Sequence, residues 1–143
     1  MRFFFAAMLF VLVACENTET NSTTNLENQQ RANKVLVDPD WLSEHLNDIN
    51  VQILDLGQTR QGYLNGHIAK AHFIDWTKDI TDPERPELFM NLPKEMLEAL
   101  LSHLGIDQTS TIVLYDNMNS RLSTRMFWTL RYYGHEDIRI LDG

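Results

Sequence analysis

The sequence has one cysteine in 143 residues, and this scarcity limits its chemistry. A single thiol forms no disulfide within the chain and supplies neither a CxxC pair nor a Cys/His zinc site. Basic residues are also few: 12 lysines and arginines stand against 20 aspartates and glutamates, which gives a formal net charge of −8. An acidic chain of this kind is a poor partner for nucleic acid. We therefore expect no nucleic acid partner, no metal and no cofactor.

A long apolar run is also lacking. The longest run, residues 3–13, follows Arg2 and is shorter than the about 20 residues that a transmembrane helix needs. A basic start followed by a short apolar stretch is typical of a secretory signal peptide. Ala14 and Cys15 complete a pattern that resembles the lipobox of bacterial lipoproteins. We expect residues 1–14 to be removed and Cys15 to carry a lipid anchor in a membrane of the bacterial cell envelope, with the domain facing the periplasm.

Residues 15–33 are rich in Asn, Thr, Glu and Gln and contain few large apolar side chains. Such a stretch buries too little apolar surface to offset the entropy lost on ordering, so we predict a flexible tether. The remainder, residues 34–143, has the size of a single domain.

The predicted domain alternates between short apolar runs and segments with helical periodicity. We predict strands at 35–37, 51–56, 71–74, 111–115 and 138–141, and helices at 39–46, 93–104 and 122–133. The segment around Tyr63 and Gly66 is predicted to be a compact connection. Strands separated by helices form right-handed βαβ units, so the predicted fold class is α/β, with a parallel sheet and helices on both faces.

Several side chains are predicted to be buried because they occupy periodic apolar positions. In the helix at 93–104 these are Met96, Leu97, Leu100, Leu101 and Leu104. Trp41, Trp76 and Trp128 are assigned to core packing, and His67 is interpreted as a buried, hydrogen-bonded scaffold residue.

The candidate site is the loop that follows the strand at 111–115, because ligands of parallel α/β sheets bind beyond the carboxyl ends of the strands. Backbone amides, a helix N-terminus and nearby arginines could together bind an anion there. The candidates are Asp116, Asn117, Ser120, Arg121 and Arg125. In the structural alternative, Asp116 and Ser123 only satisfy amides at the helix start, and the arginines are solvated or paired with carboxylates. Physical chemistry alone favours this alternative.

Short motifs spread over the predicted domain resemble, in order and spacing, those of the rhodanese family. They are Trp41-Leu42, Asp55, Gly66-His67-Ile68, Leu92-Pro93, Leu104-Gly105-Ile106, Val113-Leu114-Tyr115-Asp116, Arg125-Met126-Phe127-Trp128 and Leu130-Arg131-Tyr132-Tyr133-Gly134-His135. The sequence looks most similar to the N-terminal half of tandem-domain thiosulfate and 3-mercaptopyruvate sulfurtransferases, and Leu141-Asp142-Gly143 also matches that half.

The resemblance implies a reaction in which a loop thiolate takes sulfane sulfur from a small anionic sulfur compound and holds it as a persulfide. A thiol or cyanide then accepts the sulfur. In this sequence Asp116 occupies the position of the family's cysteine, and a carboxylate forms no persulfide. The resemblance therefore implies a non-catalytic N-terminal domain of an envelope sulfurtransferase, whose reactive cysteine lies in a C-terminal rhodanese domain absent from this chain.

The sequence departs from the family pattern in three places, one of which is Ala69-Lys70, where the family has Pro-Gly. Gly57 stands where an arginine often follows Asp55, so an ion pair is lost unless Arg60 supplies it. The chain also stops after the strand at 138–141, where the family continues into a helix, so we expect a domain truncated at its C-terminal end. One alternative is a non-catalytic rhodanese-like binding or regulatory lipoprotein. A phosphatase on the related fold is disfavoured because it needs the same loop cysteine.

Overall fold

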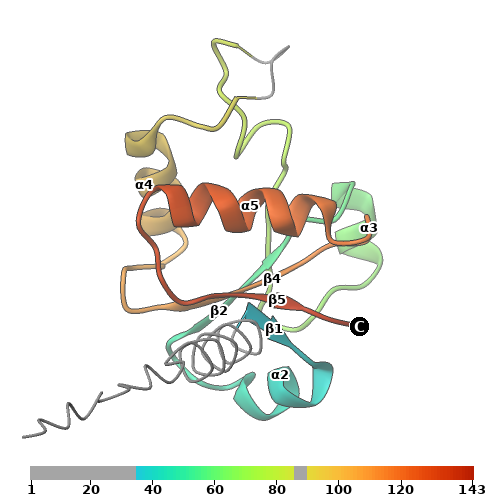
Figure 1. The fold of residues 1–143 in the computed structure, drawn as a ribbon. Coiled ribbons are helices and arrows are strands. Elements are labelled where there is room, and N and C mark those ends of the chain that lie inside the picture. Colours follow the sequence, from blue (N-terminus) through green and yellow to red (C-terminus); the bar gives the residue numbers. More distant parts are fainter. Residues whose placement is uncertain (1–34, 86–89) are drawn as a thin grey trace, which may run out of the picture. The chain divides into compact units, whose positions relative to one another are not determined.

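The computed structural model describes residues 35–85 and 90–143 (Figure 1). The predicted signal peptide, Cys15 and the tether lie outside the described residues. The strands are β1 (Leu36–Val37), β2 (Val51–Asp55), β3 (His72–Phe73), β4 (Thr111–Tyr115) and β5 (Ile138–Leu141). The helices are α2 (Pro39–His45), α3 (Arg60–Asn65), α4 (Lys94–His103) and α5 (Arg121–Tyr132). All predicted strands and helices are present, with ends that differ by a residue at most.

The strands form one parallel sheet in the order β1-β5-β4-β2-β3. β4 lies at the centre, and its three middle residues, Ile112 to Leu114, are fully buried. Their apolar character follows from this position, because a central parallel strand is covered on both faces. The register aligns Asp55 at the end of β2 with Tyr115 at the end of β4. The predicted α/β class with a parallel sheet is confirmed.

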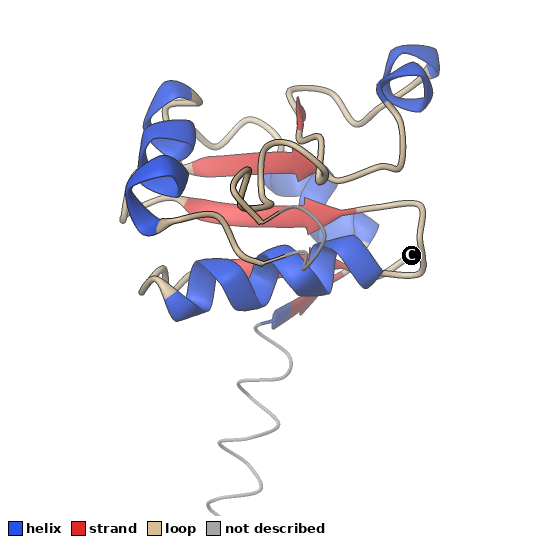
Figure 2. Ribbon diagram, turned by 90° about the horizontal axis from the view of Figure 1, so that it is seen from above, coloured by secondary structure: helices blue, strands red, loops and turns tan. Residues whose placement is uncertain are grey.

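Helices pack on both faces of this sheet. On one face, Leu54 and Leu114 belong to a buried cluster that includes Leu97 of α4 and Met126 of α5. On the other face, Ile53 and Val113 pack with Val37 and with Leu42 of α2. Figure 2 shows α5 running alongside the strands. Since neighbouring residues of a strand point to opposite faces, β2 and β4 supply both clusters.

Helix α3 was not predicted, because it buries no residue and so carries no apolar period. It begins where the Gly62 N–H donates to Thr59 Oγ1 over 3.1 Å, and this side-chain cap starts a helix without help from packing. The prediction that His67 is buried is wrong, because His67 follows this exposed helix and is itself exposed. Its ring stacks on Tyr63 at a centroid distance of 3.7 Å, and its Nδ1 lies 2.9 Å from the Tyr63 carbonyl oxygen.

Two other burial predictions are wrong, and both concern residues beside a buried stripe. Met96 is 46% exposed and Trp128 is 65% exposed, because each lies one step in sequence from the side chains that face the sheet. One residue rotates a helical position by about 100°, enough to leave a narrow contact face. Trp41 and Trp76, by contrast, pack against the two buried clusters, as predicted.

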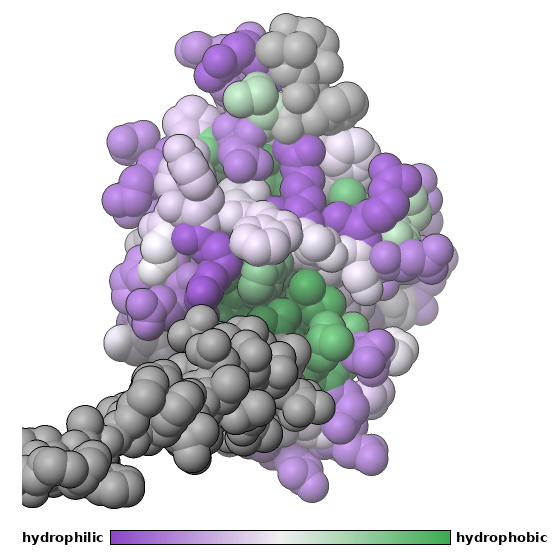
Figure 3. Space-filling model, viewed as in Figure 1, coloured by the Kyte–Doolittle hydropathy of each residue, from purple (hydrophilic) through white to green (hydrophobic). Residues whose placement is uncertain are grey.

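The visible surface in Figure 3 is mostly hydrophilic, with a limited hydrophobic area below α5. None of the helices in the described part is long and apolar enough to span a bilayer. The described residues also bring together no group of three or more His, Cys, Asp or Glu side chains that could hold a metal ion.

Candidate functional site

The loop between β4 and α5 turns sharply at two consecutive residues in the left-handed region. Asn119 has φ = 54° and Ser120 has φ = 58°. Asparagine tolerates this conformation better than most residues, whereas serine has no such preference. Left-handed turns of this kind direct successive backbone N–H groups to one side, which makes a concave site for negative charge.

The carboxylate of Asp116 occupies this concave site. The N–H groups of Met118 and Ser120 donate to Asp116 Oδ1 over 2.7 and 3.0 Å, and the Ser123 N–H donates to Oδ2 over 2.7 Å. Hydrogen bonds to an ionised acceptor are stronger than neutral ones, and the start of α5 adds a favourable dipole. The loop thus holds its own side-chain anion.

These bonds are those that the structural alternative predicts for Asp116. The same alternative is wrong about Ser123, whose hydroxyl oxygen is buried and has no hydrogen-bond partner in the described structure. Ser123 contributes through its backbone N–H instead.

A second polar group joins the ends of β2 and β4. The Tyr115 hydroxyl donates to Asp55 Oδ2 over 2.5 Å, and the Gly57 N–H donates to Asp55 Oδ1 over 2.7 Å. The Ile68 N–H donates to the Tyr115 hydroxyl oxygen over 3.2 Å. Burial and the hydrogen bond to Asp55 raise the pKa of Tyr115, so its phenol is a neutral donor at physiological pH.

Arg60 does not replace the arginine that is absent after Asp55. Its guanidinium lies 5.9 Å from the ring centroid of Phe73, while both Asp55 oxygens accept the bonds described above. Gly57 has a steric role here: a Cβ at this position would lie 2.8 Å from Asp55 Oδ1. The glycine therefore permits the close approach of its own N–H to the carboxylate.

The loops after β2 and β4 are also linked directly, since the Gln58 N–H donates to Asn117 Oδ1 over 3.1 Å. Asn117 therefore positions the loop and is not aimed at a ligand through this oxygen. The Ser120 side chain is exposed, and its carbonyl oxygen accepts a bond from the Thr124 hydroxyl.

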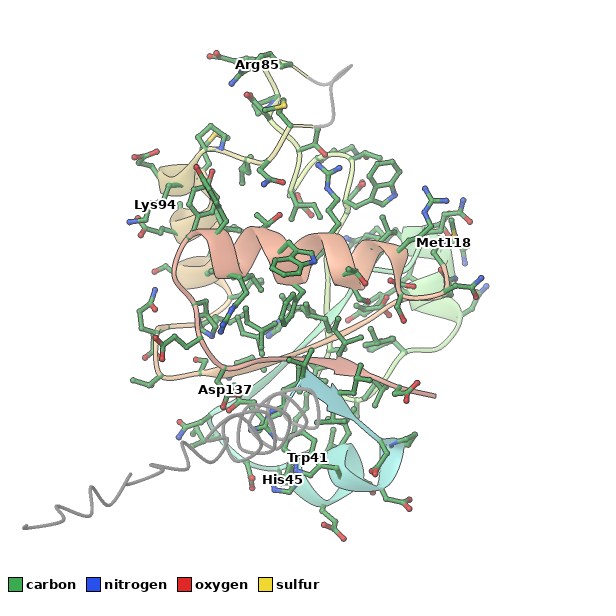
Figure 4. The ribbon with its side chains drawn as sticks, viewed as in Figure 1. Trp41, His45, Arg85, Lys94, Met118 and Asp137 are labelled. Carbon is green, nitrogen blue, oxygen red and sulfur yellow. The ribbon has the colours of Figure 1, made fainter. Side chains whose placement is uncertain are left out.

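Beside this loop lies a cavity of about 260 Å³. It is lined by Gln58, Trp76, Met118, Arg121, Leu122 and Arg125. Figure 4 shows Met118 at the amino-terminal end of α5. Arg125 Nη2 lies 3.5 Å from the Thr81 hydroxyl, and burial lowers the pKa of its guanidinium.

The structure divides the five candidate residues between two places. Asp116, Asn117 and Ser120 form the loop, whereas Arg121 and Arg125 line the cavity. The sequence did not reveal Gln58, Trp76, Met118 and Leu122 as neighbours of these arginines, because three distant segments supply the lining. Only the alignment of β2 with β4 brings Gln58 near this helix start.

Comparison with known proteins identifies the family of this chain. Residues 38–143 match the family of rhodanese-like domains. The chain is 36% identical over 110 residues to the sulfur carrier protein TtuD of Thermus thermophilus. It is 34% identical over 110 residues to a protein from Saccharopolyspora erythraea that carries a provisional thiosulfate sulfurtransferase name. Each alignment covers 77% of this chain and 38% of the relative, so the chain spans well under half of their length.

A solved structure agrees with these relatives. SseA from Escherichia coli, described as a 3-mercaptopyruvate sulfotransferase with the rhodanese fold, superposes with a TM-score of 0.65 and 33% identity. The match covers 74% of this chain and 44% of that chain.

Proposed function

This chain belongs to the family of rhodanese-like domains, and we propose that it is the N-terminal, non-catalytic part of an envelope sulfurtransferase anchored by lipid at Cys15. In that protein, sulfane sulfur passes from thiosulfate or 3-mercaptopyruvate to a thiol or to cyanide. The names of the relatives, which include a thiosulfate and a 3-mercaptopyruvate enzyme, support the reaction class. The apolar run before Cys15 supports the proposed location in the cell envelope and the lipid anchor.

The hydrogen bonds of Asp116 carry the proposal that the reactive cysteine lies elsewhere. With thiosulfate, a thiolate attacks the outer sulfur, sulfite leaves, and the enzyme holds a persulfide. Cyanide then attacks the outer persulfide sulfur, thiocyanate leaves, and the thiolate is restored. A carboxylate forms no persulfide, and the three amides that would stabilise an anionic sulfur are already bound to Asp116.

A cyanide assay tests this proposal. The chain is purified as a Cys15→Ser variant, which removes the only thiol, and incubated with thiosulfate and cyanide. Thiocyanate should form no faster than in a heat-denatured control. The matched variant adds Asp116→Cys, which places a thiol beside the same amides and should gain the mass of one sulfur atom from thiosulfate. Thiocyanate turnover by the Cys15→Ser chain itself contradicts the proposal.

The lipid anchor has its own test, because it is independent of the sulfur chemistry. The full chain is expressed in a bacterium with a lipoprotein pathway and fractionated. The wild-type chain should sediment with the membranes, and Cys15→Ala should be found in the soluble fraction. An equal membrane fraction for both chains argues against the anchor.

A second candidate function, a non-catalytic binding or regulatory lipoprotein, is favoured by the cavity that Arg121 and Arg125 line. It differs from the first because it needs no catalytic domain. The gene sequence beyond the codon for Gly143 distinguishes the two: a second rhodanese domain with a loop cysteine supports the first, and its absence supports the second.

A further inference from the structure

The outward side of α5 carries a stripe of aromatic and basic side chains. Trp128 and Tyr132 follow Arg121 by seven and eleven residues, so the three lie within about 20° of one line along the helix. All three are exposed, whereas the opposite face of α5 packs on the sheet. Figure 1 shows α5 lying across one side of the sheet. The stripe is about 16 Å long and lies mostly outside the core.

Each exposed ring of the stripe is held by a neighbouring ring that is anchored in the core. Trp128 meets Phe127 edge to face at a centroid distance of 5.4 Å. Tyr132 meets Tyr133 in the same way at 4.9 Å. Phe127 and Tyr133 pack against the buried cluster, and the Tyr133 hydroxyl donates to the Leu92 carbonyl oxygen over 2.8 Å. The exposed rings therefore have a fixed orientation, and a partner that buries them costs little conformational entropy.

The charge on this side of α5 has the opposite sign to the net charge of the chain. The chain has a formal net charge of −8, but α5 contains no carboxylate, and Arg121 and Arg131 are both exposed on it. Arg131 donates to the carbonyl oxygen of Glu136 over 3.1 Å. Among the residues that the structure describes, no ion pair joins Arg121 or Arg131 to a carboxylate. Because salt screens charges beyond about 8 Å, a partner that touches this side responds mainly to these arginines.

This combination of side chains suits the surface of a lipid bilayer. Tryptophan and tyrosine have an apolar body and a polar tip, and they gather at the boundary between lipid chains and headgroups. Arginine keeps its charge among the headgroups and binds phosphate through two N–H groups at once. A second copy of the chain is a poorer partner. If two copies packed through this stripe, arginines would face arginines, and α5 supplies no carboxylate to offset the repulsion.

We propose that α5 docks the domain on an anionic bilayer surface, with Trp128 and Tyr132 among the lipid headgroups and Arg121 and Arg131 beside the phosphates. The contact is shallow, because the other face of α5 belongs to the core and stays there. The inference rests on the proposed function in one respect, since the lipid on Cys15 holds the domain close to a bilayer. The docking itself requires neither a reactive cysteine nor a second domain.

Vesicle sedimentation at constant ionic strength tests the docking without the anchor. The protein is the chain from residue 15 onward with Cys15→Ser, because the apolar run at 3–13 would itself bind lipid, and residues 32–143 form a compact unit without it. Vesicles of phosphatidylglycerol and phosphatidylcholine in equal parts should bind it saturably, and pure phosphatidylcholine about tenfold more weakly or less. Trp128→Ser should weaken binding to the anionic vesicles by about tenfold, and Arg121→Gln by about fivefold.

Two variants away from α5 are the matched controls. Ile49→Ser removes an exposed apolar side chain from the turn between α2 and β2. Lys70→Gln removes an exposed basic side chain that donates to the Leu46 carbonyl oxygen, next to α2 and so on the other side of the sheet. Both variants should bind the anionic vesicles like the parent.

Tryptophan fluorescence locates the contact. At saturating lipid, brominated phosphatidylcholine mixed with phosphatidylglycerol should quench the parent chain. The quenching should be lost in Trp128→Phe, because Trp41 and Trp76 are partly buried against the two clusters of the core.

Four results overturn the proposal: no saturable binding to the anionic vesicles, equal binding to pure phosphatidylcholine, a loss in Ile49→Ser or Lys70→Gln as large as that in Trp128→Ser, or quenching that survives in Trp128→Phe. A dimer in sedimentation equilibrium that Trp128→Ser dissociates also overturns it, and makes the stripe an interface between copies. The anchor is judged separately by the fractionation of Cys15→Ala, because the chain in the vesicle experiment carries no lipid.

Discussion

At the scale of single residues, the Asp116 carboxylate accepts hydrogen bonds from three backbone N–H groups that have no other acceptor among the described residues. Its removal should therefore destabilise the loop. We expect Asp116→Ala to lower the free energy of unfolding by about 2 kcal/mol, the range for hydrogen bonds to a charged group. Asp116→Asn should lose less, because its amide keeps one oxygen acceptor. Urea denaturation measures both values.

The control for Asp116 is Asp142→Ala, which removes an exposed carboxylate near the end of β5. It should change the stability by no more than about 0.5 kcal/mol, as is usual for surface substitutions. If Asp116→Ala and Asp142→Ala have the same small effect, the loop amides do not depend on the carboxylate.

Tyr115 gives a prediction at high pH. Burial and the bond to Asp55 raise its pKa in the folded chain, whereas an unfolded tyrosine ionises near about 10. Above that pH the unfolded state binds fewer protons than the folded state, so stability falls as the pH rises. The Tyr115→Phe variant has no phenol to ionise, so its stability lacks this pH dependence. At neutral pH the variant also leaves Asp55 without one hydrogen-bond donor.

The expected result is a stability difference between wild type and Tyr115→Phe that narrows as the pH rises through about 10. Urea denaturation at a series of pH values measures it. Tyr132→Phe removes the phenol of a residue that is 76% exposed, so its stability difference from wild type should stay constant with pH, and it serves as the control. A difference that stays constant with pH would show that Tyr115 does not carry the effect.

At the scale of elements, α2 depends on a side-chain cap at its start. The Trp41 N–H donates to Asp38 Oδ1 over 2.7 Å, and Pro39 occupies the first turn, where a missing N–H costs nothing. We expect Asp38→Ala to cost about 1 kcal/mol of stability. Asp40→Ala is the matched control, because it removes a carboxylate of the same turn that accepts no capping bond. Equal losses of stability for the two variants would mean that negative charge near the helix start, and not the capping hydrogen bond, stabilises α2.

The elements that the sequence predicted share a cause. β4 and one face of α5 bury apolar residues, and the regular spacing of these residues in the sequence can be recognised without a structure. Helix α3 buries no residue, so its sequence shows no apolar period. It depends on the single side-chain cap from Thr59. The exposure of Trp128 was not predicted for a different reason. An aromatic residue inside an apolar segment does not reveal on which side of the helix it lies.

The site was predictable only in part. The position of the loop followed from the parallel sheet, and the bonds of Asp116 followed from the need to satisfy amides at a helix start. The cavity was not predictable, because Trp76 and Gln58 reach Arg121 only after the whole sheet has formed.

At the scale of the whole molecule, the site depends on contacts between distant segments. Asp55 and Tyr115 are 60 residues apart, and Gln58 and Asn117 are 59 residues apart. These bonds form only when β2 and β4 pair, and that pairing also closes the core on both faces. The geometry of the loop and the stability of the fold should therefore be lost together.

The net charge of −8 gives a prediction for the complete chain. Two effects of salt compete: it screens the repulsion among the surplus acidic groups, and it weakens exposed ion pairs such as Lys78–Asp75 and Lys94–Glu98. Exposed pairs are each worth about 0.2–1 kcal/mol at most, whereas the excess of negative charge is spread over many side chains. We therefore expect the repulsion to dominate, and the melting temperature to rise with sodium chloride.

The rise should amount to a few degrees between low and physiological ionic strength, which corresponds to about 1 kcal/mol for a domain of this size. Scanning calorimetry at fixed pH measures it. A variant with Glu44→Gln and Asp142→Asn removes two exposed negative charges and should show a smaller rise, because less repulsion remains to be screened. Arg131→Gln, which makes the chain more acidic, should show a larger one. A melting temperature that falls as salt is added would mean that the exposed ion pairs outweigh the net charge.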